Sequence, residues 1–434
     1  MRASNKLRDS SAMPQNDMKN TMIGIGLSPN AAWDDVILAA SVLATPWRWF
    51  RGGFVRALEE WFKRYFAAKS AIAFDSGRSS EYAILKAINI SPSDEVLVQA
   101  FTCVAVPNSV LWAGGKPIYV DVDKTGNIDV ADLEKKITPK TKAIIVQHTF
   151  GIAASIEKIQ TIAKEHRLIL IEDCAHSLGA TVAGKKLGSF GDFAFFSFGR
   201  DKVVSSVCGG MVILNNSRYA KNIRGFQKNL SFPSVGWIFS QLFHPIVFSF
   251  IVLPFYNVLG IGKIVLVIFQ RLGLLSKPVA EKEKRGERPA FYPKKLPNAQ
   301  AIVALNQVKK LSAFNTKRQE IAAFYTKALA DSVFTLPTIK KTDIVLRYNI
   351  QTQHASALYR FAKDKGILLG RWYGHVIDPT GVEYTKIVYQ AGSCPKAEFL
   401  ARQSLNLPTY PKMSLGDAAR VVAVLTEYGR NKDH

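Results

Sequence analysis

Short apolar runs alternate with amphipathic segments from about residue 55 to residue 215. The amphipathic segments repeat apolar residues at helical spacing, whereas the short runs between them are almost wholly apolar. We predict helices at 55–66, 79–88, 104–114 and 155–166, and strands at 70–74, 95–101, 116–123, 142–148, 168–173, 192–198 and 210–216. This alternation indicates a mostly parallel sheet covered on both faces. In such sheets ligands bind beyond the carboxyl ends of the strands.

The pattern changes near residue 290. A long helical stretch covers 299–330, and a strand-like run at 344–352 follows it. Helical segments at 356–366 and 415–429 complete the chain. This part is predicted to be a smaller α+β domain.

An apolar segment separates the two parts. Residues 202–280 contain no Asp or Glu, and residues 231–262 contain no charged residue at all. A membrane-spanning helix needs about 20 apolar residues. Basic residues flank the segment on both sides, among them Lys228 and Lys277. We expect this insertion to contact a membrane, with an extra buried layer or a dimer surface as the alternative.

Composition narrows the classes of partner. The formal charge of the 434-residue chain is +23, which favours anionic ligands or surfaces. No nucleic-acid motif accompanies that charge, so we expect no nucleic acid as partner. The four cysteines are widely spaced, which predicts reduced thiols and no metal site. The polar residues 1–20 are not typical of a signal peptide.

Acidic residues end one predicted strand. Asp173 follows the run at 168–172, and His176 lies three residues on. A carboxylate at this position either caps the next helix or faces a cationic ring nitrogen of a cofactor. A lone histidine is more often structural, and only its proximity to Asp173 makes it a candidate.

A second candidate is the helix start at Gly77, Arg78 and Ser79, after Asp75 and Ser76. Its free N–H groups can hold a phosphate, or the segment is an ordinary helix cap. The third candidate is Lys202, which stands in an otherwise apolar stretch. A desolvated lysine beside a strand end can form a Schiff base with pyridoxal phosphate.

Several segments taken in order resemble the DegT/DnrJ/StrS-type sugar aminotransferases. They are residues 75–85, 95–123, 171–180, 188–216 and 406–414. The resemblance covers roughly residues 50–230 and 290–425. It implies the α/β fold type I of pyridoxal-phosphate (PLP) transferases, with a mostly parallel sheet in the large domain and a smaller C-terminal α+β domain.

The resemblance also implies roles for individual residues. Lys202 takes the place of the Schiff-base lysine and Asp173 that of the partner of the pyridine nitrogen. The other implied cofactor contacts are His176 at the ring, Ser197 and the backbone of Gly77, Arg78 and Ser79 at the phosphate, and Cys103 where an aromatic ring commonly stacks. Members of the family are usually homodimers with active sites at the interface.

This chain departs from the family pattern in four places. Cys103 replaces the stacking aromatic residue, while Phe101 matches a different position. Arg78 stands where threonine is common, and Pro293 where the partner subunit often donates an asparagine. The sequence before the lysine reads Gly199–Asp201 in place of a His-Pro pair.

We therefore predict four parts: an N-terminal arm and first helix at 1–50, a PLP-binding domain at 51–230, the apolar insertion at 231–289 and the C-terminal domain at 290–434. The predicted activity is transfer of an amino group, from glutamate or another amino acid, to a nucleotide- or lipid-linked keto-sugar. Such a product would enter cell-surface polysaccharide or glycolipid synthesis. Arg371, Trp372, Tyr373 and His375 are candidates for the substrate side.

Two other functions stay open at this point. One is a PLP-dependent sugar dehydratase, in which the lysine is often replaced by histidine; Lys202 argues against it. The other is a non-catalytic, membrane-bound regulatory protein. For the insertion, Lys263, Arg271 and two prolines, Pro245 and Pro254, which we expect to break helices, favour a monotopic hairpin over two full spans. We expect a cytoplasmic protein that attaches through residues 235–276 to the inner face of the cell membrane.

Overall fold

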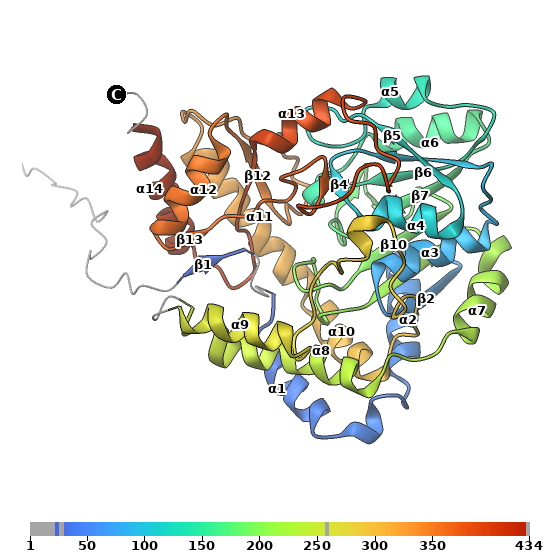
Figure 1. The fold of residues 1–434 in the computed structure, drawn as a ribbon, viewed down its shortest axis with the longest axis horizontal. Coiled ribbons are helices and arrows are strands. Elements are labelled where there is room, and N and C mark those ends of the chain that lie inside the picture. Colours follow the sequence, from blue (N-terminus) through green and yellow to red (C-terminus); the bar gives the residue numbers. More distant parts are fainter. Residues whose placement is uncertain (1–21, 26–29, 257–259, 431–434) are drawn as a thin grey trace, which may run out of the picture.

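The computed structural model describes residues 22–25, 30–256 and 260–430. The segment 1–20, for which we expect no signal peptide, lies outside the described residues. The large part of the molecule is built around a seven-stranded sheet (Figure 1) with the strand order β2-β11-β10-β7-β6-β3-β5. The strands are β2 Ser70–Phe74, β3 Glu95–Gln99, β5 Lys116–Val120, β6 Thr141–Gln147, β7 Ile169–Asp173, β10 Phe193–Ser197 and β11 Gly210–Leu214.

The sheet is mostly parallel, as predicted. Pairs from β10 through β7, β6 and β3 to β5 are parallel, and only β11 runs antiparallel to its neighbours β10 and β2. Both faces are covered by helices. Alternate residues of β2 show this, because Ala71 and Ala73 belong to one apolar cluster and Ile72 and Phe74 to another.

The helices divide between these two clusters. The first cluster contains residues of α2 (Phe54–Phe66), α5 (Val130–Lys135), α6 (Ile156–Glu165) and α10 (Asn298–Lys309). The second contains residues of α3 (Gly77–Ala87), α4 (Ala105–Ala113) and α7 (Ala220–Asn229). Because α10 packs on the sheet side with α2, the large part includes residues beyond 290.

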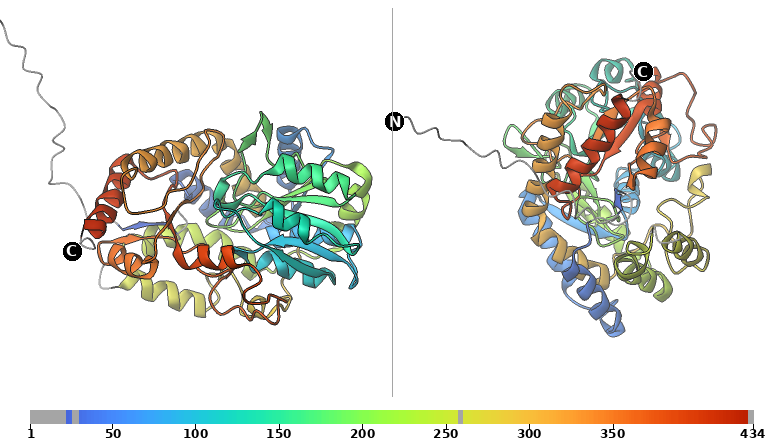
Figure 2. Two further views of the ribbon diagram at one scale, coloured as in Figure 1. Left: turned by 90° about the horizontal axis from the view of Figure 1, so that it is seen from above. Right: turned by 90° about the vertical axis from the view of Figure 1, so that its left-hand side faces the viewer.

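The C-terminal part is a smaller α+β unit beside the sheet, as Figure 2 shows. Strand β12 (Tyr348–Gln351) pairs antiparallel with β15 (Ser404–Leu407), and β1 (Ile23–Gly24) pairs parallel with β13 (Ile367–Leu368). Helices α11 (Leu311–Ala328), α12 (Ala355–Asp364) and α14 (Leu415–Arg430) contribute to its separate apolar cluster. The remaining elements are α13 (Pro395–Gln403) and the short pairs β4 (Thr102–Cys103) with β14 (Ile377–Asp378) and β8 (Thr181–Val182) with β9 (Lys185–Lys186).

The apolar insertion folds as a helical hairpin along one side of the molecule (Figure 1). Helix α8 (Val235–Val247) continues into a π-helical turn at Phe248–Val252, and α9 (Ile261–Arg271) returns beside it. The inner face of α8 packs on α1 (Trp33–Leu43) and on α10. Ile238 and Leu242 are buried there with Val42 and Ala299. The sequence kept an extra buried layer open as an alternative to membrane contact. Helix α8 forms such a layer.

Proline affects the hairpin less than we expected. Pro254 follows the helical turn, but Pro245 lies inside α8, which is a correction to the expected break. A helix tolerates one proline where neighbouring packing compensates for the lost N–H bond. The π-helical turn begins three residues later, with Leu253 N–H donating to Phe248 O at 2.9 Å.

Helix α9 is apolar on both faces. Leu266 and Phe269 pack inward against the α8 side of the hairpin. Its outer face exposes Ile264, Val267 and Ile268, of which 56%, 47% and 46% of the surface is accessible. Among the described residues one helix, Val235–Val252, is long and apolar enough to cross a membrane, and half of it is buried in the protein.

The inner face of α8 should therefore be part of the stable core, whereas the outer face of α9 should not. We expect Ile238→Ala to lower the free energy of unfolding by about 2–5 kcal/mol, because its side chain is fully buried. The matched variant Ile264→Ala should change it by no more than about 0.5 kcal/mol. Urea unfolding in one buffer measures both, and equal effects would contradict this division.

Candidate active site

The carboxyl ends of β7, β10 and β2 meet at one edge of the sheet. Asp173 ends β7 and Ser197 ends β10, and Phe195 is paired with Asp173 across the two strands. Helix α3 begins at Gly77, directly after β2, and Ser76 bridges to Gly209 before β11. The sheet thus brings three of the predicted groups together.

The start of α3 lies very close to the two strands beneath it. A Cβ atom on Gly77 would be 2.9 Å from Ser197 Cβ, and one on Gly210 would be 2.7 Å from Gly77 N. Such distances leave no room for a side chain at either glycine. The Ser197 hydroxyl therefore faces the helix N-terminus, an arrangement that suits a phosphate.

Capping of α3 restricts the predicted phosphate cradle. Ser79 N–H donates to Ser76 Oγ at 3.1 Å, so it already has an acceptor. The cradle that remains consists of the Gly77 and Arg78 N–H groups and the Ser197 hydroxyl. The Arg78 side chain turns elsewhere: it lies 2.9 Å from Glu283 and donates to Tyr292 Oη at 2.8 Å. Its guanidinium thus ties α3 to the segment after the insertion.

Lys202 lies against His176, with 2.8 Å between Lys202 Nζ and His176 Nε2. Phe150 N–H donates to His176 Nδ1 at 3.3 Å, so that nitrogen carries no proton. Burial, with a contribution from the Lys202 charge, holds the pKa of His176 well below its usual value, and the neutral ring keeps its proton on Nε2. That proton can be donated to Lys202 Nζ when the lysine is a neutral amine.

The pKa of Lys202 agrees with this assignment. Desolvation lowers it to about 8, while Asp173 and Cys103 act in the opposite direction. The ammonium is thereby destabilised and the nucleophilic amine becomes more available near neutral pH. Lys202 Nζ also lies 4.7 Å from the centroid of the Trp372 ring.

Asp173 is 4% exposed and accepts one hydrogen bond, from Ala175 N–H at 3.0 Å. Burial raises its pKa, and the Ala175 bond and the charge of Lys202 oppose that shift. A buried carboxyl of this kind is stabilised as the anion when a cation is placed against it. It is thus suited to a protonated ring nitrogen.

The neighbouring carboxylate, Glu172, has a structural environment. It accepts hydrogen bonds from the N–H groups of Gly188, Phe190 and Gly191, at 2.6–2.8 Å, and lies 3.2 Å from His148 Nε2. His148, Glu172 and Cys174 are close enough together to hold a metal ion. Because the Glu172 oxygens are already bonded, we interpret this cluster as the anchor of the loop that leads into β10.

Cys103 lies at the edge of the site on β4, and it is close enough to influence the pKa of Lys202. Phe101 packs away from it, against Phe150 and Tyr373. Of the candidates near residue 373, Trp372 stacks on His176 with 5.4 Å between ring centroids. Arg371 is exposed and lies over Tyr359.

Sequence reasoning missed two charged residues here, of which the first is Arg347. It precedes β12 and is 3% exposed, with its guanidinium carbon 3.7 Å from the centroid of the Trp372 ring. An arginine directly after the apolar run at 344–346 was the available signal. Glu81 was also missed. Burial, together with the charge of Asp173, raises its pKa well above the usual range.

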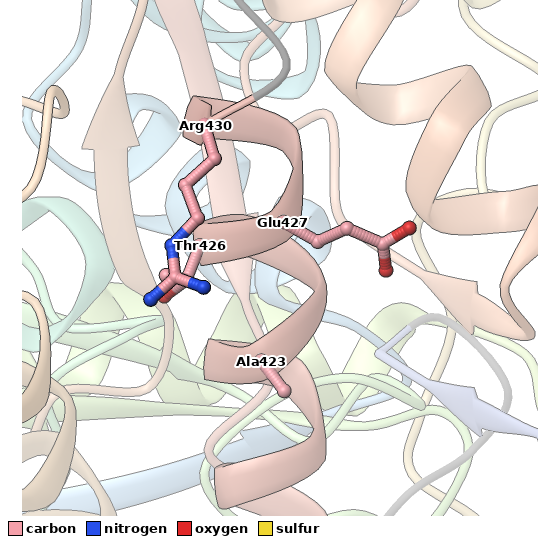
Figure 3. A pocket seen from close by; sticks show the side chains of 4 residues that line it. All are labelled: Ala423, Thr426, Glu427 and Arg430. Atoms are coloured by element: carbon pink, nitrogen blue, oxygen red, sulfur yellow. The ribbon is translucent and has the colours of Figure 1, made fainter.

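A separate hollow of about 360 Å³ lies on the exposed side of α14, as Figure 3 shows. It is lined by Ala423, Thr426, Glu427 and Arg430. Glu427 pairs with Lys365 at 2.7 Å. None of the predicted site residues lies in it.

The comparisons with known proteins identify the family and the fold. The chain matches the DegT/DnrJ/EryC1/StrS aminotransferase family over residues 35–244 and 262–426. It is 30% identical over 391 residues to a "pleiotropic regulatory protein" of Geobacillus stearothermophilus, which covers 88% of this chain and 91% of that protein. It is 28% identical to the UDP-N-acetyl-3-dehydro-α-D-glucosamine 3-aminotransferase of Acidithiobacillus ferrooxidans, over 85% of this chain and 87% of that enzyme. The structure of NtdA from Bacillus subtilis with bound PMP superposes with a TM-score of 0.74 at 23% identity, covering 96% of this chain and 87% of that one.

The fold is thus that of the fold type I PLP-dependent transferases, which confirms the predicted fold class. The chain belongs to the DegT/DnrJ/EryC1/StrS aminotransferase family. It is a PLP-dependent aminotransferase, and PLP is its cofactor. The residues present fit that cofactor, because Gly77 at the start of α3 carries no side chain and faces Ser197, while a buried carboxyl and a lysine of lowered pKa lie at the same sheet edge.

The low pKa of Lys202 should be visible in the pH dependence of stability. Between the folded value of about 8 and the usual 10.5, the unfolded chain binds more protons, so stability rises with pH. Replacing the lysine by methionine removes this dependence. We therefore expect the stability of the Lys202→Met variant relative to wild type to be highest below pH 8 and to decrease steadily towards pH 10.5.

Urea unfolding of the cofactor-free proteins at several pH values measures the difference. The lost bond to His176 shifts all values alike, so the slope is the readout. Lys309→Met, at an exposed position, is the control. A constant difference between Lys202→Met and wild type would contradict the assignment of a neutral amine.

Proposed function

We propose that this aminotransferase moves an amino group from an amino acid, glutamate in the first instance, to a keto-sugar linked to a nucleotide or a lipid. The product would serve cell-surface polysaccharide or glycolipid synthesis. The observation that carries the proposal is the buried Lys202, which lies 2.8 Å from His176 Nε2 near Asp173 and whose pKa desolvation lowers to about 8. The relative from A. ferrooxidans is named for 3-amination of a UDP-sugar, which supports a sugar nucleotide as substrate.

Each site residue has a proposed task. Bound PLP supplies an electron sink for the electrons of the bond broken at the amino acid's α-carbon. The Gly77 and Arg78 N–H groups and Ser197 hold its phosphate, and Asp173 keeps its ring nitrogen protonated. Lys202 would hold the cofactor covalently, and its amine would serve as the base and acid that moves a proton. His176 orients the lysine, and Cys103 borders the ring without stacking on it.

A non-catalytic regulatory role is the second candidate, since one relative carries the name of a regulatory protein. The retained Lys202, Asp173 and helix start favour catalysis. The same lysine argues against a sugar dehydratase. We also propose that the enzyme works as a homodimer, following the resemblance.

Turnover tests the proposal directly. The purified enzyme with PLP and glutamate should convert one member of a panel of nucleotide- and lipid-linked keto-sugars, and mass spectrometry of the product identifies it. Lys202→Ala should lower kcat by more than about 10³-fold, because it removes both the covalent link and the proton carrier. Asp173→Asn should keep the fold and lose most activity, because an amide does not hold a ring nitrogen protonated.

Borohydride reduction of the PLP-loaded enzyme followed by peptide mapping is the companion measurement. A label on Lys202 agrees with the proposed link, and a label on another lysine contradicts it. A protein that binds PLP but converts no donor would favour the regulatory role.

We further propose that the enzyme attaches to the cytoplasmic face of the cell membrane through the hairpin within residues 235–276. The outer face of α9 is exposed and apolar, and α1 extends this surface with Trp33, which contacts Phe250 at 5.4 Å between ring centroids. Lys263 and Arg271 are exposed at either end of α9. A helix that presents apolar residues between cations suits an anionic lipid surface.

The acidic residues of α1 do not oppose contact between this surface and anionic lipids. The acids of α1, Asp34 and Asp35, are paired with Lys310 at 2.7 and 2.8 Å. Since α8 is held by α1 and α10, the hairpin would lie on the membrane and α9 would enter the headgroup region. The two segments that match the family are separated by residues 245–261, which fall within the insertion.

Vesicle sedimentation tests the attachment. The wild-type enzyme should sediment with vesicles of phosphatidylcholine and phosphatidylglycerol and less with phosphatidylcholine alone. Binding should persist in part at high salt, because apolar burial is not screened. The triple variant Ile264→Glu, Val267→Glu and Ile268→Glu should stay in the supernatant.

The control variant carries Val333→Glu and Phe399→Glu, two exposed apolar positions outside the hairpin. It should sediment as the wild type does. Wild-type protein that remains in the supernatant with both kinds of vesicle would contradict membrane attachment.

A further inference from the structure

Residues 198–209 form the loop between β10 and β11 that carries the reactive lysine, here called the lysine loop. The apolar insertion holds this loop near both of its ends. Near the first end, Arg200 Nη2 donates to the Ser276 hydroxyl at 2.6 Å and also to the Ser276 carbonyl oxygen. Near the second end, the Cys208 thiol donates to Gln241 Oε1 at 3.2 Å. Gln241 lies on α8 and Ser276 follows α9, so both halves of the hairpin reach the loop.

One chain of hydrogen bonds joins these contacts. The Ser276 hydroxyl donates to Gln241 Oε1 at 3.1 Å, so the two side chains that hold the loop are bonded to each other. Gln241 is 1% exposed, and its Nε2 donates to Ser240 Oγ at 2.8 Å and to Trp237 O at 3.3 Å. Burial raises the pKa of the Cys208 thiol to about 12, so the thiol keeps the proton that it donates. Both polar atoms of the Gln241 amide therefore have partners, and a buried network that is fully bonded is rigid.

The backbone beside the second contact is strained. Val207 has a φ of 69°, a left-handed conformation that is unfavourable for a β-branched residue. Gly209 follows with a φ of 139° and forms a bridge to Ser76 at the start of α3. Strained backbone persists only where surrounding contacts hold it in place. The bond from Cys208 to α8 is one such contact, and it lies where the lysine loop meets the predicted phosphate cradle.

The segment after the hairpin also holds the first turn of α3. Arg78 donates to Pro278 O at 2.6 Å and lies 2.9 Å from Glu283. Pro278 is only two residues from Ser276, which accepts from Arg200. One short segment therefore contacts both the phosphate cradle and the lysine loop.

The middle of the lysine loop has anchors outside the insertion. Arg318 of α11 donates to Val203 O at 2.8 Å, and Ser205 N–H donates to Gln307 Oε1 of α10 at 3.2 Å. These bonds remain when the contacts to the insertion are removed. Loss of the contacts at the ends should therefore loosen the loop without unfolding the protein.

We propose that Gln241 and Ser276 of the insertion are positioning residues that keep Lys202 in its buried place against His176. The inference rests on the proposed covalent link between Lys202 and the cofactor. Both side chains act through the ends of the lysine loop, by the bonds described above. The insertion thereby serves the active site in addition to its proposed contact with a membrane.

The pKa of Lys202 reports its position, because desolvation lowers that pKa to about 8. The titratable groups around the amine are those of His176, Asp173, Cys103, Arg347 and Asp201. None of these groups belongs to the insertion, and Gln241 and Ser276 are uncharged, so replacing either leaves the charges around the lysine unaltered. A loosened loop admits water to the amine, and its pKa should then rise towards the usual 10.5.

The rate at which PLP attaches to the cofactor-free protein, followed by cofactor absorbance at several pH values, measures this pKa. Gln241→Met removes the amide at nearly constant side-chain length. It should move the midpoint upwards by about 0.5 to 1 pH unit and lower the attachment rate at neutral pH by roughly three- to tenfold. Ser276→Ala should act in the same direction but less, because Arg200 still donates to the Ser276 carbonyl oxygen.

Ile238→Ala is the matched control on the same helix. It removes a buried side chain that packs on α1 and α10, so it lowers stability but leaves the bonds to the lysine loop in place. Its midpoint should equal that of the wild type. Unfolding curves verify that each variant is folded.

Hydrogen exchange of the cofactor-free proteins is an independent readout. In Gln241→Met, the amides of residues 198–209 should exchange faster than in the wild type, relative to the amides of β6 in the same sample. Ile238→Ala should leave this ratio unchanged.

The outcomes are distinct. An unchanged midpoint in folded Gln241→Met overturns the inference, as does an equal upward shift in Ile238→Ala. A wild type that binds PLP at Lys202 but converts no keto-sugar contradicts the proposed function instead, and the midpoints still decide the positioning role. If PLP attaches to another lysine, the exchange ratio decides: faster exchange of the lysine loop in Gln241→Met supports the positioning role, and an unchanged ratio overturns it.

Discussion

The site depends on the close approach of one helix start to two strands. Ser76 and Gly77 lie so near β10 and β11 that a Cβ on Gly77 or Gly210 would meet neighbouring atoms at 2.9 or 2.7 Å. The antiparallel pairing of Ser197 with Gly210, and the parallel pairing of Phe195 with Asp173, fix where these strands end. A phosphate-binding helix start and a buried carboxyl are therefore placed by the backbone before any side chain adjusts.

Burial determines the pKa shifts of the titratable side chains around this helix start. His176, Lys202 and Asp173 each have a pKa shifted towards the neutral form, with desolvation as the largest cause. The hydrogen bond from Phe150 N–H then decides which His176 nitrogen carries the proton, and so makes Lys202 the acceptor. A cationic cofactor ring placed against Asp173 would offset part of the free energy that burial costs the ionised carboxylate. Without a cofactor, the lowered pKa of Lys202 thus makes its nucleophilic amine more available. A bound cationic ring would pair with the Asp173 carboxylate.

The sequence predicted the sheet and the start of α3 well, because apolar periodicity and local motifs determine them. It could not predict that Ser79 N–H is used by Ser76, or that Arg78 turns to Glu283, since both depend on side-chain geometry. Arg347 was missed for a related reason. It is remote in sequence from Lys202, and only the packing of the C-terminal part on the sheet brings both to Trp372. Pro245 was misjudged because tertiary packing outweighs a local helix-breaking tendency.

The insertion combines two kinds of surface in one hairpin. Ile238 and Leu242 on α8 belong to the same buried cluster as α1 and α10, so this helix is continuous with the core. Helix α9 contacts the hairpin's own residues and exposes Ile264, Val267 and Ile268 on its other side. A soluble loop would carry polar residues on that side, and a spanning hairpin would not bury half of Val235–Val252 in the protein. In the proposed membrane attachment the protein would determine the depth of this apolar helix, while the cations at its ends would meet the headgroups.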